Sequence, residues 1–498
     1  MKRTFFILLL LVGLCTEVFP RTISPSGIEL GYEYTHQFRS LLPANVEDEE
    51  SVQEAAAFHA AHLFGLFHSP EGAEAHGYYA DLVEGFAGTK HPEVVRSRGF
   101  QKAGDPYLWV EYQVKAKMLV LRDVVTDWIG EEKGGTVELP LLVDLPAIYS
   151  DNGEDYRKKK WKRCTDSHYS TAVDFSYFYN PFRCEELSAL PLAAPAKFKI
   201  ERLGKESSAR FPKKELLQDN GNGPLTTLYF VAGFDDTPAP GSSAHEIHQD
   251  AGWKTYASVE RLLTKKYGFK KMTSLAELRT ALGSDFSRLE LSTPVTLVHD
   301  TQRRYFSTFV KKAGKQIYVA RSALFDTHNE VRSSPLRSFP KFWKEAWQNG
   351  DVIYFGGHSG DGQSVSLENM LSTLDNLDLD DIVFQAKKKQ VALFDSCSSY
   401  AHYQDMYLKR KPKGLHLVTF GLVSLFEYAE ATLDGFMSLV LASDGANESW
   451  TLALRAIERR QLPAHVKAFY DPSEQKAILE EFQHAQAFPS SLMSVWVP

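Results

Sequence analysis

The chain has 498 residues, of which 43% are hydrophobic and 24% are charged. This composition is typical of a globular protein with room for two or three domains. The net charge of −7 argues against a nucleic-acid-binding protein, because such proteins usually carry a strong basic excess. The run from Arg157 to Arg163 is basic but follows an acidic patch, so we interpret it as a solvated loop.

Residues 1–20 have the pattern of a secretory signal peptide. Two positive charges precede an apolar run that is too short to span a bilayer, which takes about 20 residues. We therefore expect the mature protein to be exported and to be periplasmic, on the cell surface or secreted. Cys15 closes the apolar run, and membrane attachment is expected only if this cysteine carries a lipid.

Residues 21–104 are predicted to be a mostly helical N-terminal region. The stretch ESVQEAAAFHAAHLFGLF has apolar residues at helical spacing. His59 and His62 in this stretch could share a helix face and bind a metal. Histidines on an alanine-rich helix are more often packed or exposed, so we predict no metal here.

Residues 105–203 are predicted to form a small β-rich domain, because they combine β-branched and aromatic residues with partial alternation. Cys164 and Cys184 lie in this domain and could form a disulfide in an oxidising compartment. Cys397 is then the odd cysteine, which indicates either an inert buried thiol or a reactive one.

Residues 204–223 include the polar, glycine-rich stretch QDNGNGP and are interpreted as a linker. From residue 224 to 498 strands alternate with helices, which predicts an α/β domain with a mostly parallel sheet flanked by helices. Its expected strands include LTTLYFVAGF, DVIYFGG, QVALFDSC and GLHLVTFG. In such sheets, ligands bind at the carboxyl ends of the strands.

Two chemically reactive residues follow two of these strands. His358 comes after VIYFGG and Cys397 comes after VALFDS, with a predicted helix and a charged turn between them. This is a βαβ unit, so we expect both side chains at the same edge of the sheet. A thiol needs a base or a positive neighbour to ionise near neutral pH, and the histidine can supply it.

The pattern of strand, Gly-His, about 40 residues, strand and Asp-x-Cys resembles the caspase-like cysteine peptidases, and most of all the metacaspases, over residues 224–440. The resemblance implies that His358 is the general base and Cys397 the nucleophile. It also implies an oxyanion hole made by the backbone N–H groups of Cys397 and Ser359. No cofactor is implied, and the expected partner is a protein or peptide substrate.

The same resemblance suggests a substrate preference. Asp395 occupies the position that lines a pocket for a basic P1 side chain in metacaspases, and Asp235 or Asp236 could add a second carboxylate. Cleavage after arginine or lysine is therefore implied.

The sequence also departs from the family pattern. Ser359 follows the histidine where the family usually has glycine, and Ser398 begins a Ser-Ser-Tyr stretch where a metacaspase has His-Ser-Gly. A second register would place Asp361 at the position of the base and imply an inactive enzyme. We prefer the first register because Gly-His directly ends the apolar strand.

Two alternatives remain open at this point. The stretch GHSGD approximates the G-x-S-x-G turn of α/β-hydrolases, with Ser359 as nucleophile, although Asp361 replaces the last glycine. Its triad could be completed by Asp395 or Asp434 together with His416 or His465. The chain could instead be an inactive binding or scaffold protein with a caspase-like domain. His245 and His248 could mark a metal site, but they lack the two-residue spacer of the H-E-x-x-H motif, and we predict no metal.

Overall fold

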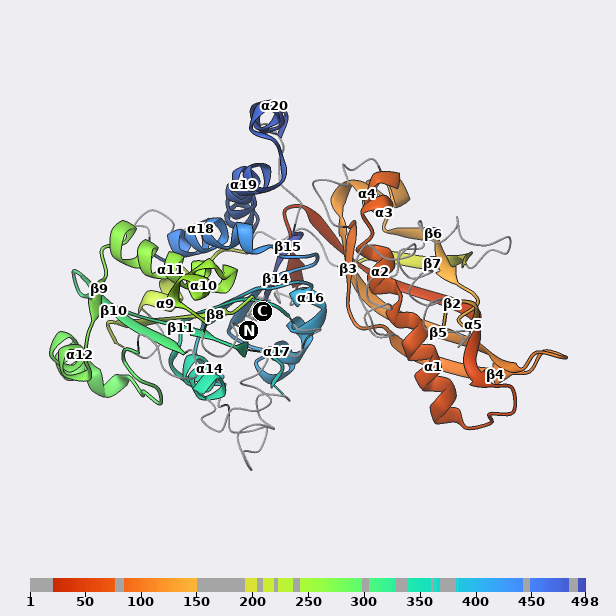
Figure 1. Ribbon diagram of the computed structural model, residues 1–498, viewed down its shortest axis with the longest axis horizontal. Helices are drawn as coiled ribbons and strands as arrows, with labels where there is room; N and C mark the ends of the chain where they lie inside the picture. Colours follow the sequence, from red (N-terminus) through yellow and green to blue (C-terminus); the bar gives the residue numbers. More distant parts are fainter. Residues whose placement is uncertain are drawn as a thin grey trace, which may run out of the picture.

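The computed structural model describes residues 21–76, 85–149, 193–203, 209–218, 223–235, 242–297, 304–327, 338–359, 362, 364–367, 382, 384–441, 448–482 and 491–498. These residues form an N-terminal β unit and a C-terminal α/β unit that lie side by side (Figure 1). No helix among the described residues is both long enough and apolar enough to cross a membrane.

The α/β unit is built on a large mixed sheet. Its described strands follow the spatial order β1-β15-β14-β13-β12-β8-β11-β10-β9, in which β14, β13, β12, β8 and β11 run parallel to one another. The outer strands on both sides are antiparallel. The strands are β1 (Arg21–Ile23), β8 (Leu225–Gly233), β9 (Lys270–Met272), β10 (Tyr305–Ala313), β11 (Gln316–Phe325), β12 (Val352–Gly356), β13 (Gln390–Asp395), β14 (Leu415–Phe420) and β15 (Met493–Val497).

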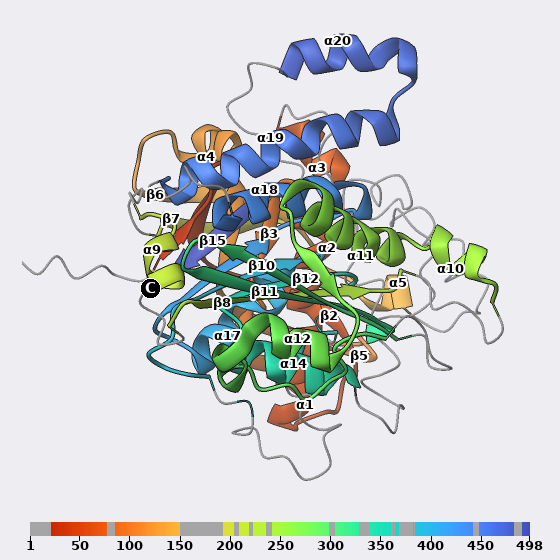
Figure 2. The same cartoon turned by 90° about the vertical axis from the view of Figure 1, so that its left-hand side faces the viewer.

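Helices cover both faces of this sheet, which explains why its central strands are continuous apolar runs. Successive side chains of β12 point to opposite faces. Tyr354 belongs to the cluster on the face covered by α11 (Ala251–Arg261), α18 (Ala429–Leu441) and α19 (Trp450–Phe469). Ile353 belongs to the cluster on the face covered by α14 (Ser338–Asn349) and α17 (Gln404–Arg410) (Figures 1 and 2). The helices are α9 (Lys213–Gln218), α10 (Ala244–Gln249), α11 (Ala251–Arg261), η2 (Leu262–Lys266), α12 (Leu275–Leu282), η3 (Gly283–Arg288), α14 (Ser338–Asn349), α16 (Ser399–His402), α17 (Gln404–Arg410), η5 (Phe426–Tyr428), α18 (Ala429–Leu441), α19 (Trp450–Phe469) and α20 (Pro472–Phe482).

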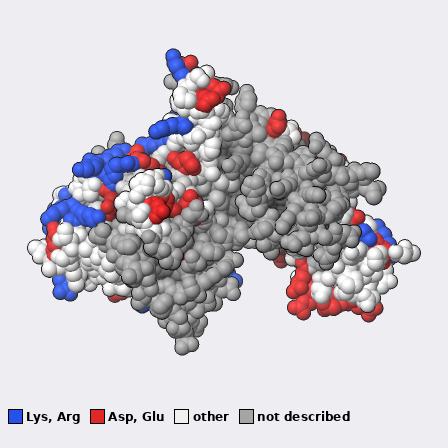
Figure 3. Space-filling model, viewed as in Figure 1, with Lys and Arg blue, Asp and Glu red and all other residues white. Residues whose placement is uncertain are grey.

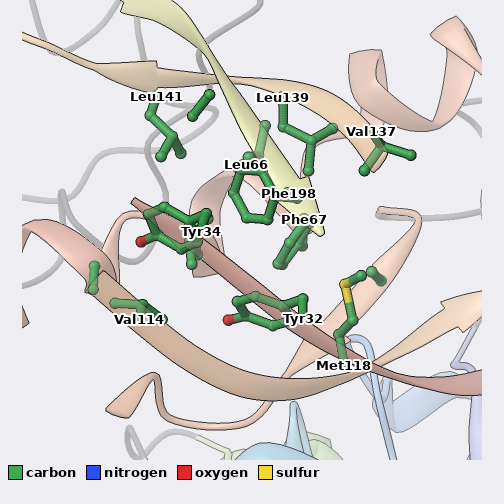
Figure 4. Packing of buried hydrophobic residues seen from close by; sticks show 14 of the residues in the cluster. Tyr32, Tyr34, Leu66, Phe67, Val114, Met118, Val137, Leu139, Leu141 and Phe198 are labelled. Atoms are coloured by element: carbon green, nitrogen blue, oxygen red, sulfur yellow. The ribbon is translucent and has the colours of Figure 1, made fainter. Parts of the chain in front are cut away.

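The N-terminal unit is an antiparallel sheet with the strand order β3-β5-β2-β7-β6, and β4 also pairs with β5. Tyr32 and Tyr34 on β2 point with Phe198 of β7 into its core (Figure 4). The elements are β2 (Gly27–Pro43), α1 (Glu49–Ala61), α2 (Leu63–Phe67), α3 (Pro70–Ala75), β3 (Ala87–Thr89), β4 (Glu93–Phe100), β5 (Tyr107–Leu121), α4 (Arg122–Ile129), β6 (Gly134–Leu142), α5 (Pro146–Tyr149) and β7 (Ala193–Arg202).

The predicted boundary between a mostly helical region over residues 21–104 and a β-rich domain over 105–203 is wrong, although α1 and α2 confirm the helix expected within ESVQEAAAFHAAHLFGLF. Strands β2, β3 and β4 belong to the same sheet as β5, so the expected boundary falls inside one unit. Along β2 every second side chain from Leu30 to Phe38 is buried, which is the period of a strand rather than of a helix. Strand β1 belongs to the other unit, because it pairs with β15.

The expected linker over residues 204–223 is also corrected in its described part. The ring of Phe211 is buried, and its centroid lies 5.2 Å from that of Trp450 on α19. Arg210 forms a β-bridge with Ser449. This segment is therefore packed on the α/β unit, and the regular alternation of strands and helices begins with β8 at Leu225, as predicted.

Several predicted features lie outside the described residues. These are the signal peptide with Cys15, the Arg157–Arg163 run, the Cys164–Cys184 pair, Asp236, Asp361 and most of the helix expected between β12 and β13.

On the face shown in Figure 3, basic side chains over the α/β unit are interspersed with acidic ones. Acidic side chains also gather at the end of the N-terminal unit where α1 and β4 lie.

Candidate functional site

Three adjacent parallel strands end at the candidate site. In the paired register, Ala232 of β8 lies opposite Gly356 of β12, which lies opposite Asp395 of β13. Shortly beyond these paired positions the three strands are followed by Asp235, His358 and Cys397, respectively. Strands β12 and β13 are neighbours and run parallel, so His358 and Cys397 follow the same ends of adjacent strands, as predicted.

His358 is held by a carboxylate from the neighbouring strand end. Its Nε2–H donates to Oδ1 of Asp235 at 2.8 Å, and its ring packs edge-on against Phe426 at 5.4 Å between centroids. The Asp235 backbone N–H in turn donates to the Asp250 carboxylate at 3.1 Å. A histidine that donates through Nε2 keeps a lone pair on Nδ1, so the second nitrogen can act as a base.

Cys397 is half-buried, and its thiol lies 3.6 Å from the backbone carbonyl oxygen of Ser424. In the described part of the chain, the hydrogen bond of the His358 ring leads to Asp235 rather than to this thiol. Catalytic hydrogen bonds are often long or absent before substrate binds, so this geometry is compatible with a dyad that closes on the substrate.

A strained turn separates Cys397 from helix α16. Ser398 has φ 50° and ψ 29°, a left-handed conformation that costs a residue with a side chain about 1–3 kcal/mol. The turn is fixed from both sides: the Ser398 N–H donates to the Leu422 carbonyl at 3.0 Å, and the Ser398 carbonyl accepts the Ala401 and His402 N–H groups. The turn lies between the end of β13 at Asp395 and the start of α16 at Ser399. Apart from two successive serines, nothing in the sequence indicates this turn.

Ser359 lies in a firmly anchored loop. Its carbonyl accepts a hydrogen bond from the Tyr403 hydroxyl at 2.7 Å and from the backbone N–H groups of Gly362 and Ser364 at 3.1 and 3.0 Å. The residue is buried, with 8% of its surface exposed. These hydrogen bonds fix the Ser359 backbone beside His358. The oxyanion hole that the resemblance implies uses the backbone N–H of Ser359 rather than its hydroxyl group.

The residues proposed to complete a serine triad have other partners. The His416 ring accepts the Trp450 indole N–H at 3.0 Å, and the His465 ring bonds to the Tyr428 hydroxyl. Asp434 pairs with basic side chains of η2 and α19. The structure therefore brings none of His416, His465 and Asp434 to Ser359.

Asp395 is buried rather than open to solvent. The Tyr354 hydroxyl donates to its carboxylate at 2.8 Å, and the Ser424 hydroxyl donates to its other oxygen. Burial raises the pKa of Asp395 to about 6, against the opposing effect of these two donors. Ser424 thus contacts both the carboxylate and the thiol of Cys397, which places Asp395 next to the candidate nucleophile.

No protein family model matches the chain, and no curated protein matches it.

The histidines considered as metal ligands are engaged in other contacts. The two ring nitrogens of His59 bond to the Tyr112 hydroxyl at 2.6 Å and the Leu142 carbonyl at 2.9 Å, and His62 bonds to the His59 carbonyl. The exposed ring of His248 stacks on Trp253. The residues that the structure describes contain no group of three or more side chains suited to hold a metal.

The contact between Asp235 and His358 is not predicted from the sequence. Asp235 is predicted to be a substrate-binding carboxylate, whereas the structure shows it bonded to His358. The sequence does contain a feature that points to this contact, because Asp235 follows an apolar strand just as His358 and Cys397 do. In the structure that strand, β8, pairs directly with β12.

Proposed function

We propose that this chain is an exported cysteine endopeptidase of caspase-like fold, with His358 as general base and Cys397 as nucleophile. One observation carries the proposal: a carboxylate, an imidazole and a thiol follow three neighbouring parallel strands in that order across the sheet. An acid that orients a base, next to a nucleophile, is the arrangement that nucleophilic catalysis requires.

The chemistry follows from this order. Asp235 accepts Nε2–H, so Nδ1 of His358 can take the proton of the Cys397 thiol as the sulfur attacks the peptide carbonyl carbon. The carbonyl oxygen becomes an oxyanion, which the backbone N–H groups of Cys397 and Ser359 would stabilise. The imidazolium then protonates the leaving amine, and the C–N bond breaks to give a thioester. Water, deprotonated by the same imidazole, hydrolyses the thioester and restores the thiol.

The proposed preference for arginine or lysine at P1 rests on Asp395. Its carboxylate lies two residues before Cys397 and shares Ser424 with the thiol. Because its pKa is raised only to about 6, this carboxyl is mainly ionised at neutral pH. It is also buried, so a cationic P1 side chain would have to enter the protein beside Ser424 to pair with it.

A catalytically inactive binding protein is the second candidate. The observation that favours it is the position of the thiol, which lies against the Ser424 carbonyl while the imidazole bonds elsewhere. Under this alternative the residues would have the same places, but Cys397 would react no faster than an ordinary thiol.

Cleavage of fluorogenic peptides tests the proposal. Peptides with arginine, lysine, asparagine or aspartate at P1 would be compared on the native chain, Cys397→Ala and Ser359→Ala. We expect cleavage after arginine and lysine, lost by on the order of a thousandfold in Cys397→Ala and kept in Ser359→Ala. Loss in Ser359→Ala alone would indicate a serine hydrolase, and no cleavage by any of the three would favour the inactive protein.

A further inference from the structure

The two segments that hold Cys397 pack on the N-terminal unit as well as on their own sheet. Tyr400, just after the cysteine, and Leu422, in the loop after β14, belong to the hydrophobic cluster of the N-terminal sheet. The backbones of Gly88 on β3 and Gly421 are in close contact, since a Cβ on Gly88 would lie 2.1 Å from the Gly421 carbonyl oxygen. Helix α16 accordingly lies at the boundary between the units, beside β3 (Figure 1).

A buried lysine makes several polar contacts across this boundary. Lys90 follows β3 and is 5% exposed. Its ammonium donates to the Tyr400 carbonyl at 2.7 Å, to Oε1 of Gln404 at 2.8 Å and to Oδ1 of Asp405 at 3.1 Å. These bonds use all three N–H groups of the ammonium. The same group lies 4.1 Å from the centroid of the Tyr400 ring, in the range of a cation–π contact.

Other side chains of the N-terminal unit meet the same short segment. Nε2 of His68 lies 3.4 Å from the hydroxyl oxygen of Ser398, the residue in the left-handed turn. The Tyr400 hydroxyl donates to Glu29 of β2 at 2.8 Å. The residues directly after Cys397 are therefore held at several points by a unit whose sheet is separate from the one that carries the site.

We infer that Lys90 is a positioning residue for Cys397, and that the N-terminal unit is part of the active enzyme rather than a detachable inhibitory segment. This inference rests on the proposed function. The strained turn at Ser398 has to be held by its surroundings. The ammonium of Lys90 fixes Tyr400 and Gln404, the residues that follow the turn, and so keeps the thiol at the sheet edge near His358.

Lys388 offers a matched control for the loss of a buried lysine. It is 3% exposed, and its ammonium pairs with the buried carboxylate of Asp351 at 3.1 Å, so its replacement likewise removes a buried, hydrogen-bonded ammonium. Lys388 precedes β13 and Cys397 follows it, so the two residues lie at opposite ends of that strand.

The test is the rate at which iodoacetamide alkylates Cys397 in the folded, full-length protein between pH 5 and 9, followed by mass spectrometry. We expect Lys90→Met to lower the rate at pH 6 at least tenfold and to move the midpoint of the pH profile upward. Lys388→Met should lower the midpoint of urea unfolding but keep the native alkylation profile. If Lys90→Met does not fold, Asp405→Asn replaces it, with an expected loss of about twofold, because this partner is exposed.

Three results would overturn the inference, and they are distinguishable. If the native chain reacts fast, His358→Ala reacts slowly and the folded Lys90 variant matches the native chain, the positioning role alone fails. If the native chain already reacts slowly at pH 6 and His358→Ala does not change the rate, the proposed function fails as well. Equal losses in the Lys90 and Lys388 variants would show a general effect of stability and would also refute the role.

Discussion

Replacing His402 should make the protein less sensitive to acid. This residue lies on α16 at the boundary between the units and is 6% exposed. Its Nδ1 is 3.3 Å from Nε2 of His91. Burial, followed by the charges of His91, His68 and Lys90, lowers the pKa of His402 to about 3. His402 is therefore neutral in the folded protein and must stay so at mildly acidic pH.

The size and sign of the effect follow from this pKa. In the unfolded chain the pKa of His402 is 6.5, so the unfolded state binds a proton at pH 5.0 that the folded state does not. Stability is lost as the pH falls below 6.5, and the loss continues toward pH 3. Between pH 7.5 and 5.0, this one residue should cost roughly 2 kcal/mol of unfolding free energy.

The assay is urea unfolding followed by tryptophan fluorescence at pH 7.5 and 5.0. We expect His402→Gln, which cannot titrate, to lose roughly 2 kcal/mol less than the native chain between these pH values. His245→Gln, on the exposed surface of α10, is the control and should behave as the native chain does. If His402→Gln and the native chain lose the same free energy on acidification, the ring is not buried in a neutral form and the reasoning is refuted.

Two further predictions concern the site and its support. Asp235→Asn should slow alkylation of Cys397 at pH 6 by about two- to fivefold, because the 2.8 Å bond to His358 joins partly exposed groups; no change would exclude an orienting role. Gly88→Ala should lower the unfolding free energy by about 1–3 kcal/mol, since its methyl group would meet the backbone across the boundary. Gly31→Ala, which meets only side-chain atoms at 3.3 Å or more, should cost less in the same urea titration.

The sequence predicted the central strands well because their pattern is simple. Strands buried on both faces are continuous apolar runs, and β8, β12, β13 and β14 all lie where such runs occur. The adjacency of β12 and β13 followed from the βαβ rule. That was enough to bring His358 and Cys397 to neighbouring strand ends without any knowledge of the remaining sheet.

The errors came from contacts that span long distances in the sequence. Strand β2 pairs with β5 across more than sixty residues, and the alanine-rich helix between them dominated the interpretation of that region. Lys90 reaches Tyr400 across 310 residues, and Asp235 reaches His358 across 123. Local periodicity carries no information on such pairs, so the link between the N-terminal unit and the site could only be seen in three dimensions.

The most direct test of the account is the alkylation rate of Cys397 near pH 6, measured by mass spectrometry in the native protein and in His358→Ala. The account predicts a fast reaction in the native protein that falls at least tenfold in the variant, because the thiolate depends on the neighbouring imidazole. Equally slow labelling of Cys397 in both proteins would contradict it, since the thiol would then be no more reactive than that of an ordinary half-buried cysteine.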